Sequence, residues 1–396
     1  MQIPLINLKA QYATIKGNAD KKVLEVLSNA QYIMGNNVKS FEKEFSKYLG
    51  VKHSVSVGNG TDALIIALKA LGIGRGDEVI TTPWTFFASA ESISFVGATP
   101  VFVDVELDTF NIDPAKIEKK INPKTKAIMV VHIFGQPCNM DAINAIAKRH
   151  NLYVIEDAAQ AVGSEYKGQK IGGLSDIATF SFFPTKNLGC AGDGGMITTD
   201  NDDLATVCRA LRVHGSGENG QKAYNVLTEA DDNVVGGSGN DNTVYNPLKY
   251  YNYLIGHNSR LDEVQAAILR VKFENLDNWN DRRRENARFY NEQLAGTAVV
   301  TPIEDSSAKH VYHLYILQSE NRAQLVTYLT KKGIATGVYY PVPLHLQKAY
   351  TGLGYREGDL PNAEYLSHRT FAIPVFPELI DSEKEYIVNA IREFSE

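Results

Sequence analysis

Short apolar runs alternate with helical patterns over the first two-thirds of the chain. The runs at 54–57, 78–82, 100–105, 127–133 and 152–156 lack an alternating polar face, which is typical of strands buried inside a parallel sheet. Between them, the segments at 61–71, 86–95, 114–120 and 140–150 have the composition and periodicity of amphipathic or buried helices. This βαβα order predicts an α/β fold with a large, mostly parallel sheet covered by helices.

The pattern changes after residue 156. The runs at 177–183 and 195–199 are joined by a connection too short for a crossover helix, so they must be antiparallel neighbours or bracket a functional turn. A long helix is predicted from near Leu261 toward Leu294, then strands at 312–317 and 335–338 and helices at 323–332 and 381–393. We therefore predict a large α/β domain at 1–265, and a linking helix with a smaller C-terminal α/β domain at 266–396.

One segment does not fit either pattern. Residues 215–246 are rich in Gly, Asn and Asp, a composition typical of a surface loop or insertion. We predict an inserted loop at 219–247, positioned to cover a substrate mouth.

Composition narrows the class of protein. The chain has 396 residues, a net charge of -6 and three scattered cysteines. This charge gives no reason to expect nucleic-acid or membrane binding, and the cysteines predict neither a disulfide framework nor a metal site. The N-terminus has no signal-peptide architecture and no run is long enough to span a bilayer, so we predict a cytoplasmic protein.

The first candidate site is the sequence GNGTDA at 58–63, between a predicted strand and a predicted helix. Gly58 and Gly60 permit a tight turn, and the helix N-terminus directs free N–H groups and a positive dipole end at an anion. The sequence also matches the dinucleotide fingerprint, with Asp77 at a suitable distance. A turn capped by Thr61, with no ligand, is the structural alternative.

The second candidate is EDAAQ at 156–160, directly after a predicted parallel strand. Open α/β sheets bind ligands at this end of their strands. A buried Asp157 that faces a pyridine nitrogen would keep that nitrogen protonated, because each charge favours the other. A helix-capping aspartate is the alternative.

The third and sharpest candidate is SFFPTKN at 181–187, followed by GDGG at 192–195. A single lysine among aromatic, proline and glycine residues is unlike an ordinary solvated charge. Desolvation lowers the pKa of a lysine and makes it nucleophilic, as Schiff-base chemistry requires. Ser181 is placed to bind a phosphate oxygen. A surface lysine in a tight turn is the alternative.

The fourth candidate is HNSRLDE at 257–263. Asn258 and Arg260 precede a predicted helix, where they either cap it or contact an anionic ligand.

Together these segments resemble the DegT/DnrJ/EryC1/StrS family of sugar aminotransferases. NGTDAL, EDAAQA, SFFPTKNLG with GDGG, HNSRLDEVQAA and YPVPLHLQ occur in family order, and the resemblance extends from 3–8 to 373–377. It implies the fold type I of pyridoxal 5'-phosphate (PLP) enzymes, similar to aspartate aminotransferase, and a homodimer whose active sites are shared between subunits.

The resemblance implies roles for individual residues around the cofactor. Lys186 is the lysine that binds PLP as a Schiff base and then carries protons, and Asp157 pairs with the pyridine N–H. Phe86 is the aromatic that stacks on the cofactor ring, and Gln160 lies beside the ring.

The same resemblance places the cofactor phosphate and the substrate. Gly60, Thr61, Asp62 and Ser181 hold the phosphate, with Asn258 added from the other subunit. Arg260, Tyr339 and Tyr340 line the sugar-nucleotide site.

The implied activity moves an amino group from glutamate to a nucleotide-linked keto sugar, for the synthesis of amino sugars in surface glycans such as lipopolysaccharide or in antibiotics. The stretch YPVPLHLQKAY favours a 3-keto-6-deoxy substrate over a 4-keto one. Tyr339 stands where relatives often have histidine, so the contact there departs from the family pattern.

Three rivals remain at this point. A PLP dehydratase of the same fold replaces the lysine with histidine, which Lys186 disfavours. An NAD-dependent sugar dehydrogenase built on GNGTDA leaves Lys186 and EDAAQ without a role. A non-enzymatic regulator is disfavoured because the sequence shows no helix–turn–helix or basic patch.

Overall fold

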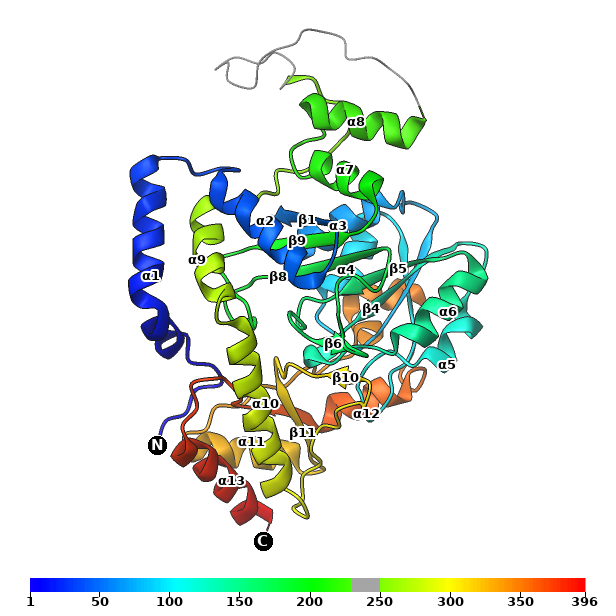
Figure 1. Cartoon of the computed structure of the whole chain (residues 1–396). Helices are drawn as coiled ribbons and strands as arrows, with labels where there is room; N and C mark the ends of the chain where they lie inside the picture. The colour runs from blue at the N-terminus through cyan, green and yellow to red at the C-terminus, as the bar shows by residue number, and fades with distance from the viewer. Residues whose placement is uncertain (230–249, 396) are drawn as a thin grey trace.

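The computed structural model describes residues 1–229 and 250–395, and its centre is a seven-stranded sheet with the order β1-β9-β8-β5-β4-β2-β3 (Figure 1). The pairs from β3 to β8 are parallel, and β9 is antiparallel to both β8 and β1. The strands are β1 (His53–Val57), β2 (Glu78–Thr81), β3 (Thr99–Phe102), β4 (Thr125–Val131), β5 (Tyr153–Asp157), β8 (Ile177–Ser181) and β9 (Gly195–Thr199). The predicted mostly parallel sheet is confirmed. Of the two alternatives for the strands that flank Lys186, the structure shows antiparallel neighbours.

Helices surround the sheet and carry the chain away from it. The helices of the first 229 residues are α1 (Leu8–Asn29), α2 (Asn36–Leu49), α3 (Gly60–Ala70), α4 (Ala88–Phe95), α5 (Pro114–Ile117), α6 (Met140–His150), α7 (Asp202–Leu211) and α8 (Gly217–Thr228). Those that follow are α9 (Glu263–Phe273), α10 (Leu276–Gln293), α11 (Arg322–Lys331), α12 (Pro361–Arg369) and α13 (Asp381–Ser395).

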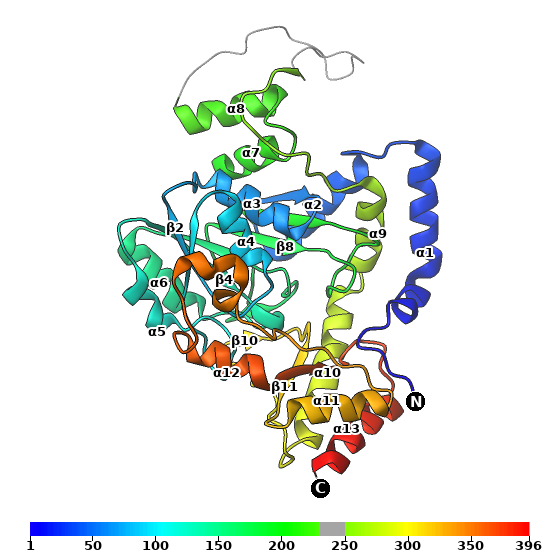
Figure 2. The same ribbon diagram turned by 180° about the vertical axis from the view of Figure 1, so that it is seen from behind.

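Two small sheets complete the structure. One has the order β10-β6-β7, from β6 (Glu165–Tyr166), β7 (Gln169–Lys170) and β10 (Ala308–Lys309), and the other pairs β11 (Tyr315–Gln318) with β12 (Thr370–Ile373). Figures 1 and 2 show α7 and α8 at one end of the molecule, and α11, α13 and β11 at the other, with α10 between the two regions. The domain boundary at 265/266 stays a prediction.

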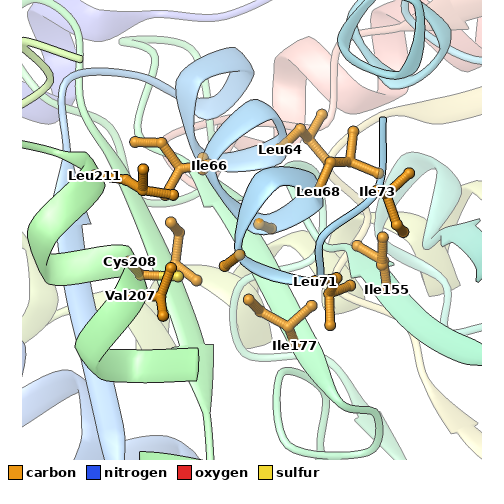
Figure 3. Packing of buried hydrophobic residues seen from close by; sticks show 14 of the residues in the cluster. Leu64, Ile66, Leu68, Leu71, Ile73, Ile155, Ile177, Val207, Cys208 and Leu211 are labelled. Carbon is orange, nitrogen blue, oxygen red and sulfur yellow. The ribbon is translucent and has the colours of Figure 1, made fainter. Parts of the chain in front are cut away.

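The main core forms where α3 packs on the sheet. Seven of the eleven residues of α3 are buried, because the helix lies between the sheet strands and its neighbours α4 and α7. Figure 3 shows Leu64 and Leu68 of α3 together with Ile155 of β5, Ile177 of β8 and side chains of α7. Burying one such side chain stabilises the fold by about 1.5–3 kcal/mol. This packing fixes the N-terminus of α3 against the ends of the strands.

Several predicted elements are wrong in extent. The helix predicted from Leu261 toward Leu294 is two helices, because the chain turns at Asn275, whose side chain donates to the carbonyl of Val271 at 3.1 Å. The predicted strand at 335–338 contains a single isolated bridge, between Gly337 and Ala372, and a second bridge, between Ile334 and Ile3, directly precedes it.

The prediction of a loop at 219–247 is also wrong for the part of this segment that the structure describes. Residues 217–228 form α8, which packs on α7 and buries Ala223. The part of the prediction at 230–247 lies outside the described residues. The N-terminal helices α1 and α2 have no counterpart in the predictions from sequence.

Among residues 1–229 and 250–395, no helix combines the length and apolar character that a membrane crossing requires.

Candidate active site

A cavity of about 490 Å³ opens where the N-terminus of α3, the end of β5 and the β8–β9 connection meet. Segments from far along the chain close its other side, including His313 and Leu314, Tyr339 and Tyr340, and Ile373. Of the twelve predicted site residues, nine line this cavity: Gly60, Thr61, Phe86, Asp157, Gln160, Ser181, Lys186, Tyr339 and Tyr340.

Lys186 lies in the short connection between β8 and β9. Its N–H donates to the carbonyl of Phe183 at 2.9 Å, which closes a tight turn. Burial lowers the pKa of Lys186 to about 8, although the negative charge of Asp157 opposes the shift. The amine is therefore available as a nucleophile and proton acceptor near neutral pH.

Asp157 is the last residue of β5 and is only 4% exposed. One carboxylate oxygen accepts a hydrogen bond from the Ser89 hydroxyl at 2.8 Å, and the other accepts from the N–H of Ala159 at 3.2 Å. Burial raises the pKa of Asp157, while these two donors and the charge of Lys186 act in the opposite direction. A cation bound in the cavity would therefore be matched by a fixed carboxylate.

The N-terminus of α3 forms the part of the cavity suited to an anion. Asn59 caps the helix by accepting from the N–H of Asp62 at 2.8 Å, and the next N–H, that of Ala63, bonds to the Asn59 carbonyl. Gly60 and Thr61, whose N–H groups begin the helix, line the cavity beside Ser181. A Cβ on Gly60 would lie 2.7 Å from the Cβ of Ser181, so only glycine lets the helix end approach β8 this closely.

Gln160, Tyr340 and Phe86 add an amide and two aromatic rings to the lining of the cavity. Gln160 accepts from the N–H of Phe134 at 2.8 Å and donates to the Tyr340 hydroxyl at 2.9 Å. Tyr340 stacks on Phe134 with an interplanar angle of 15°, and its carbonyl accepts from the Trp84 indole at 3.0 Å. Phe86 is 60% exposed at the cavity. Gln160 and Tyr340 are thus held in place, while Phe86 is accessible to a ligand.

Three predicted site residues lie outside this cavity. Asp62 is in the first turn of α3, Asn258 is exposed beside Val213, and Arg260 is half-buried. None of the three is among the described residues that line it.

The cavity is also lined by polar residues that the sequence reasoning missed, among them Asn59, Ser89, Asp193, Arg283 and His313. The signal for Asn59 was its place before a predicted helix, and that for Asp193 was the GDGG sequence. Ser89, Arg283 and His313 gave no signal, because they lie inside predicted helices or a strand and reach the cavity only through the tertiary fold.

Comparison with known proteins decides the family. The sequence model described as "DegT/DnrJ/EryC1/StrS aminotransferase family" matches residues 13–392. The chain belongs to this family. It is an aminotransferase, and the enzymes of this family depend on PLP. The predictions of the family, the PLP fold and the cofactor are therefore confirmed.

Individual relatives cover nearly the whole chain. A pleiotropic regulatory protein of Geobacillus stearothermophilus is 47% identical over 100% of this chain and 99% of its own. The dTDP-3-amino-3,4,6-trideoxy-α-D-glucose transaminase of Streptomyces venezuelae is 39% identical over 100% and 97%. The UDP-N-acetyl-3-dehydro-α-D-glucosamine 3-aminotransferase of Acidithiobacillus ferrooxidans is 40% identical over 98% and 97%.

The crystal structure of S. venezuelae DesV, in complex with a ketimine intermediate, superposes with a TM-score of 0.90 at 39% identity. The alignment covers 100% of this chain and 99% of that one. Relatives with named activities thus include nucleotide-sugar aminotransferases.

The residues of the cavity fit PLP. The end of α3 with Ser181 suits a phosphate, the buried Asp157 suits a protonated pyridine, and Lys186 is the amine of lowered pKa that the cofactor aldehyde requires. The fold also disfavours an NAD site at GNGTDA. Among residues 1–229 and 250–395, β1 is an edge strand paired only with the antiparallel β9, whereas a dinucleotide fingerprint requires a strand inside a parallel βαβ unit.

Proposed function

We propose that this protein transfers the amino group of glutamate to a keto sugar carried on a nucleoside diphosphate, with carbon 3 of the sugar as the acceptor. The observation that carries the proposal is that Lys186, with its lowered pKa, and Asp157 line one cavity. The same cavity contains Gly60 and Thr61 at the N-terminus of α3 and, beside them, Ser181, which together we call the anion cradle. The nucleotide-sugar specificity is supported by the relatives, and carbon 3 by the two transaminases that are named for that position.

The residues divide the chemistry between them. When bound, PLP supplies the electron sink for the carbanion formed at the amino carbon. Asp157 holds a positive charge at the pyridine position, since its carboxylate is fixed by Ser89 and Ala159. Lys186 takes a proton at one carbon and returns it at another, which a pKa near 8 permits in both directions.

The remaining predicted residues that line the cavity bind and orient the cofactor and the sugar. Gly60, Thr61 and Ser181 contact the phosphate, and Phe86 and Gln160 contact the ring. Tyr340 contacts the sugar, since its hydroxyl accepts from Gln160 and therefore has its own proton free to donate. Tyr339 takes the place of the histidine found in many relatives.

The three predicted residues outside the cavity have other roles: Asn258, Arg260 and Asp62. In a homodimer, Asn258 and Arg260 would complete the cavity of the partner, which is consistent with their position outside their own. Asp62 supports the cradle from the first turn of α3. A monomer in light scattering of the PLP-bound protein would exclude the shared site.

The test uses absorption of the purified protein with saturating PLP. We expect a visible band that glutamate bleaches and that a 3-keto nucleotide sugar restores. Borohydride should trap the cofactor on Lys186, as identified by mass spectrometry. NMR of the product then shows which sugar carbon carries nitrogen.

Lys186→Ala is the matched variant, and we expect it to fold and to lose about 10²–10⁴-fold in turnover, the factor typical of a side chain that transfers protons. Wild-type protein without a trappable band, or a Lys186→Ala variant that turns over normally, would contradict the proposal. An amino group at carbon 4 would contradict only the regiochemistry.

A further inference from the structure

The function proposed above leaves His313 without a role, although it lines the same cavity as Lys186. His313 lies two residues before β11 and was not a predicted site residue. Its N–H donates to the carbonyl of Phe134 at 2.8 Å, and its own carbonyl accepts from the Arg283 guanidinium at 3.4 Å. The backbone of His313 is therefore held from both sides.

A chain of buried amides determines where the ring proton of His313 lies. The Asn280 amide nitrogen donates to the carbonyl of Val162 at 3.0 Å, so the Asn280 oxygen faces the other way, toward Asn187. The Asn187 nitrogen donates to that oxygen at 2.8 Å and to the carbonyl of Val311 at 3.0 Å. Backbone carbonyls only accept, so the orientation of both amides is fixed.

The remaining Asn187 atom, its Oδ1, lies 3.2 Å from Nδ1 of His313. An amide oxygen only accepts a hydrogen bond, so Nδ1 of His313 must carry the hydrogen. Burial and the charges of Lys186, Arg283 and His310 lower the pKa of His313 well below its usual value, so the ring is neutral. A neutral ring with its hydrogen on Nδ1 keeps an unprotonated lone pair on Nε2.

The position of this lone pair follows from the same contacts. Nδ1 points to Asn187, which is only 4% exposed, so the opposite edge of the ring with Nε2 faces the cavity. Asn187 is also the residue directly after Lys186 in the chain. The amide that orients His313 is thus part of the same turn that presents the lysine.

We propose that His313 is a positioning residue for Lys186: its Nε2 lone pair accepts a hydrogen bond from the ammonium form of Lys186 and holds that amine while it carries a proton. The inference rests on the proposed function, in which Lys186 moves protons. Without this acceptor, the ammonium would lose a charge-assisted hydrogen bond at a place where burial already disfavours its charge.

The first test is long-range ¹H–¹⁵N NMR of histidine-labelled, cofactor-free protein. The His313 signals are those that disappear in His313→Gln. We expect a hydrogen on Nδ1 and none on Nε2 of His313. A hydrogen on Nε2 overturns the inference, because that nitrogen could then accept nothing.

The second test measures the titration of Lys186 by its rate of reaction with an amine reagent, quantified at this residue by mass spectrometry. His313→Asn keeps a donor toward Asn187 but removes the acceptor, so we expect the midpoint to fall by about one pH unit. His313→Gln places an amide oxygen near the former Nε2 and should return the midpoint toward wild type. An unchanged midpoint in a folded His313→Asn variant overturns the inference.

The two proposals fail separately. If borohydride traps PLP on Lys186 while the His313→Asn midpoint is unchanged, the proposed function stands and His313 has no positioning role. If PLP is not trapped on Lys186, the proposed function fails, and with it the reason for positioning this amine.

Discussion

At the residue scale, the chemistry depends on Lys186 and Asp157, two side chains of opposite charge that line the same cavity. Burial drives the pKa of Lys186 down and that of Asp157 up, so both are shifted toward neutrality. Their mutual attraction and the two donors to Asp157 resist this shift. The balance leaves an amine that is mostly protonated at physiological pH but keeps a sizeable neutral fraction, unlike an ordinary lysine.

This balance can be tested by titration of the cofactor-free protein. We expect Lys186 to react with amine reagents with a midpoint near pH 8, compared with about 10.5 for an unperturbed lysine. Asp157→Asn removes the negative charge that favours the ammonium, so the midpoint should move to still lower pH. A wild-type midpoint near the unperturbed value, or a rise in Asp157→Asn, would contradict the electrostatic account.

At the scale of single elements, the position of α3 decides the anion cradle. The helix is apolar on nearly all sides, and its burial brings its N-terminus against β8. Gly60 permits that approach, since a side chain there would meet Ser181. The helix core and the cradle are therefore consequences of one packing arrangement.

Gly60→Ala should destabilise the protein by about 1–3 kcal/mol in urea unfolding, because the added methyl overpacks the contact with Ser181. Gly17→Ala is the matched control. Gly17 lies inside α1 and a Cβ there meets nothing within 4 Å, so this variant should gain about 0.5–1 kcal/mol from helix propensity. Equal effects of the two substitutions would show that the close contact at Gly60 is unimportant.

At the scale of the whole molecule, distant segments hold each other in place. Gly35 precedes α2 and has no side chain with which to cap it, and the cap comes instead from Glu263 at the start of α9. The Glu263 carboxylate, 2% exposed, accepts from the N–H groups of Asn37 at 2.9 Å and Val38 at 2.8 Å. The beginning of the chain is thus anchored to the helix that leads away from the large sheet.

Glu263→Gln tests this anchor. The substitution replaces one acceptor oxygen with a donor that faces a backbone N–H, so we expect a loss of about 1–3 kcal/mol in the free energy of unfolding. Glu274→Gln, at an exposed position at the end of the same helix, should change stability by no more than about 0.5 kcal/mol. Comparable losses in both variants would argue against the cap.

The sequence by itself determined the alternation of elements, the mostly parallel sheet and the lysine turn between β8 and β9. It did so because apolar runs and glycine turns are local signals that survive in any fold of the chain. Motifs in order along the chain also indicated the family, and nine of the predicted site residues lie around one cavity.

Only the tertiary structure showed which side chains fix those residues. Ser89 reaches Asp157, Asn187 orients His313, and Glu263 caps α2, across separations of 68, 126 and 225 positions respectively. A contact between residues so far apart has no periodicity or spacing that a sequence can reveal. It exists only once the sheet and helices have brought the two segments together.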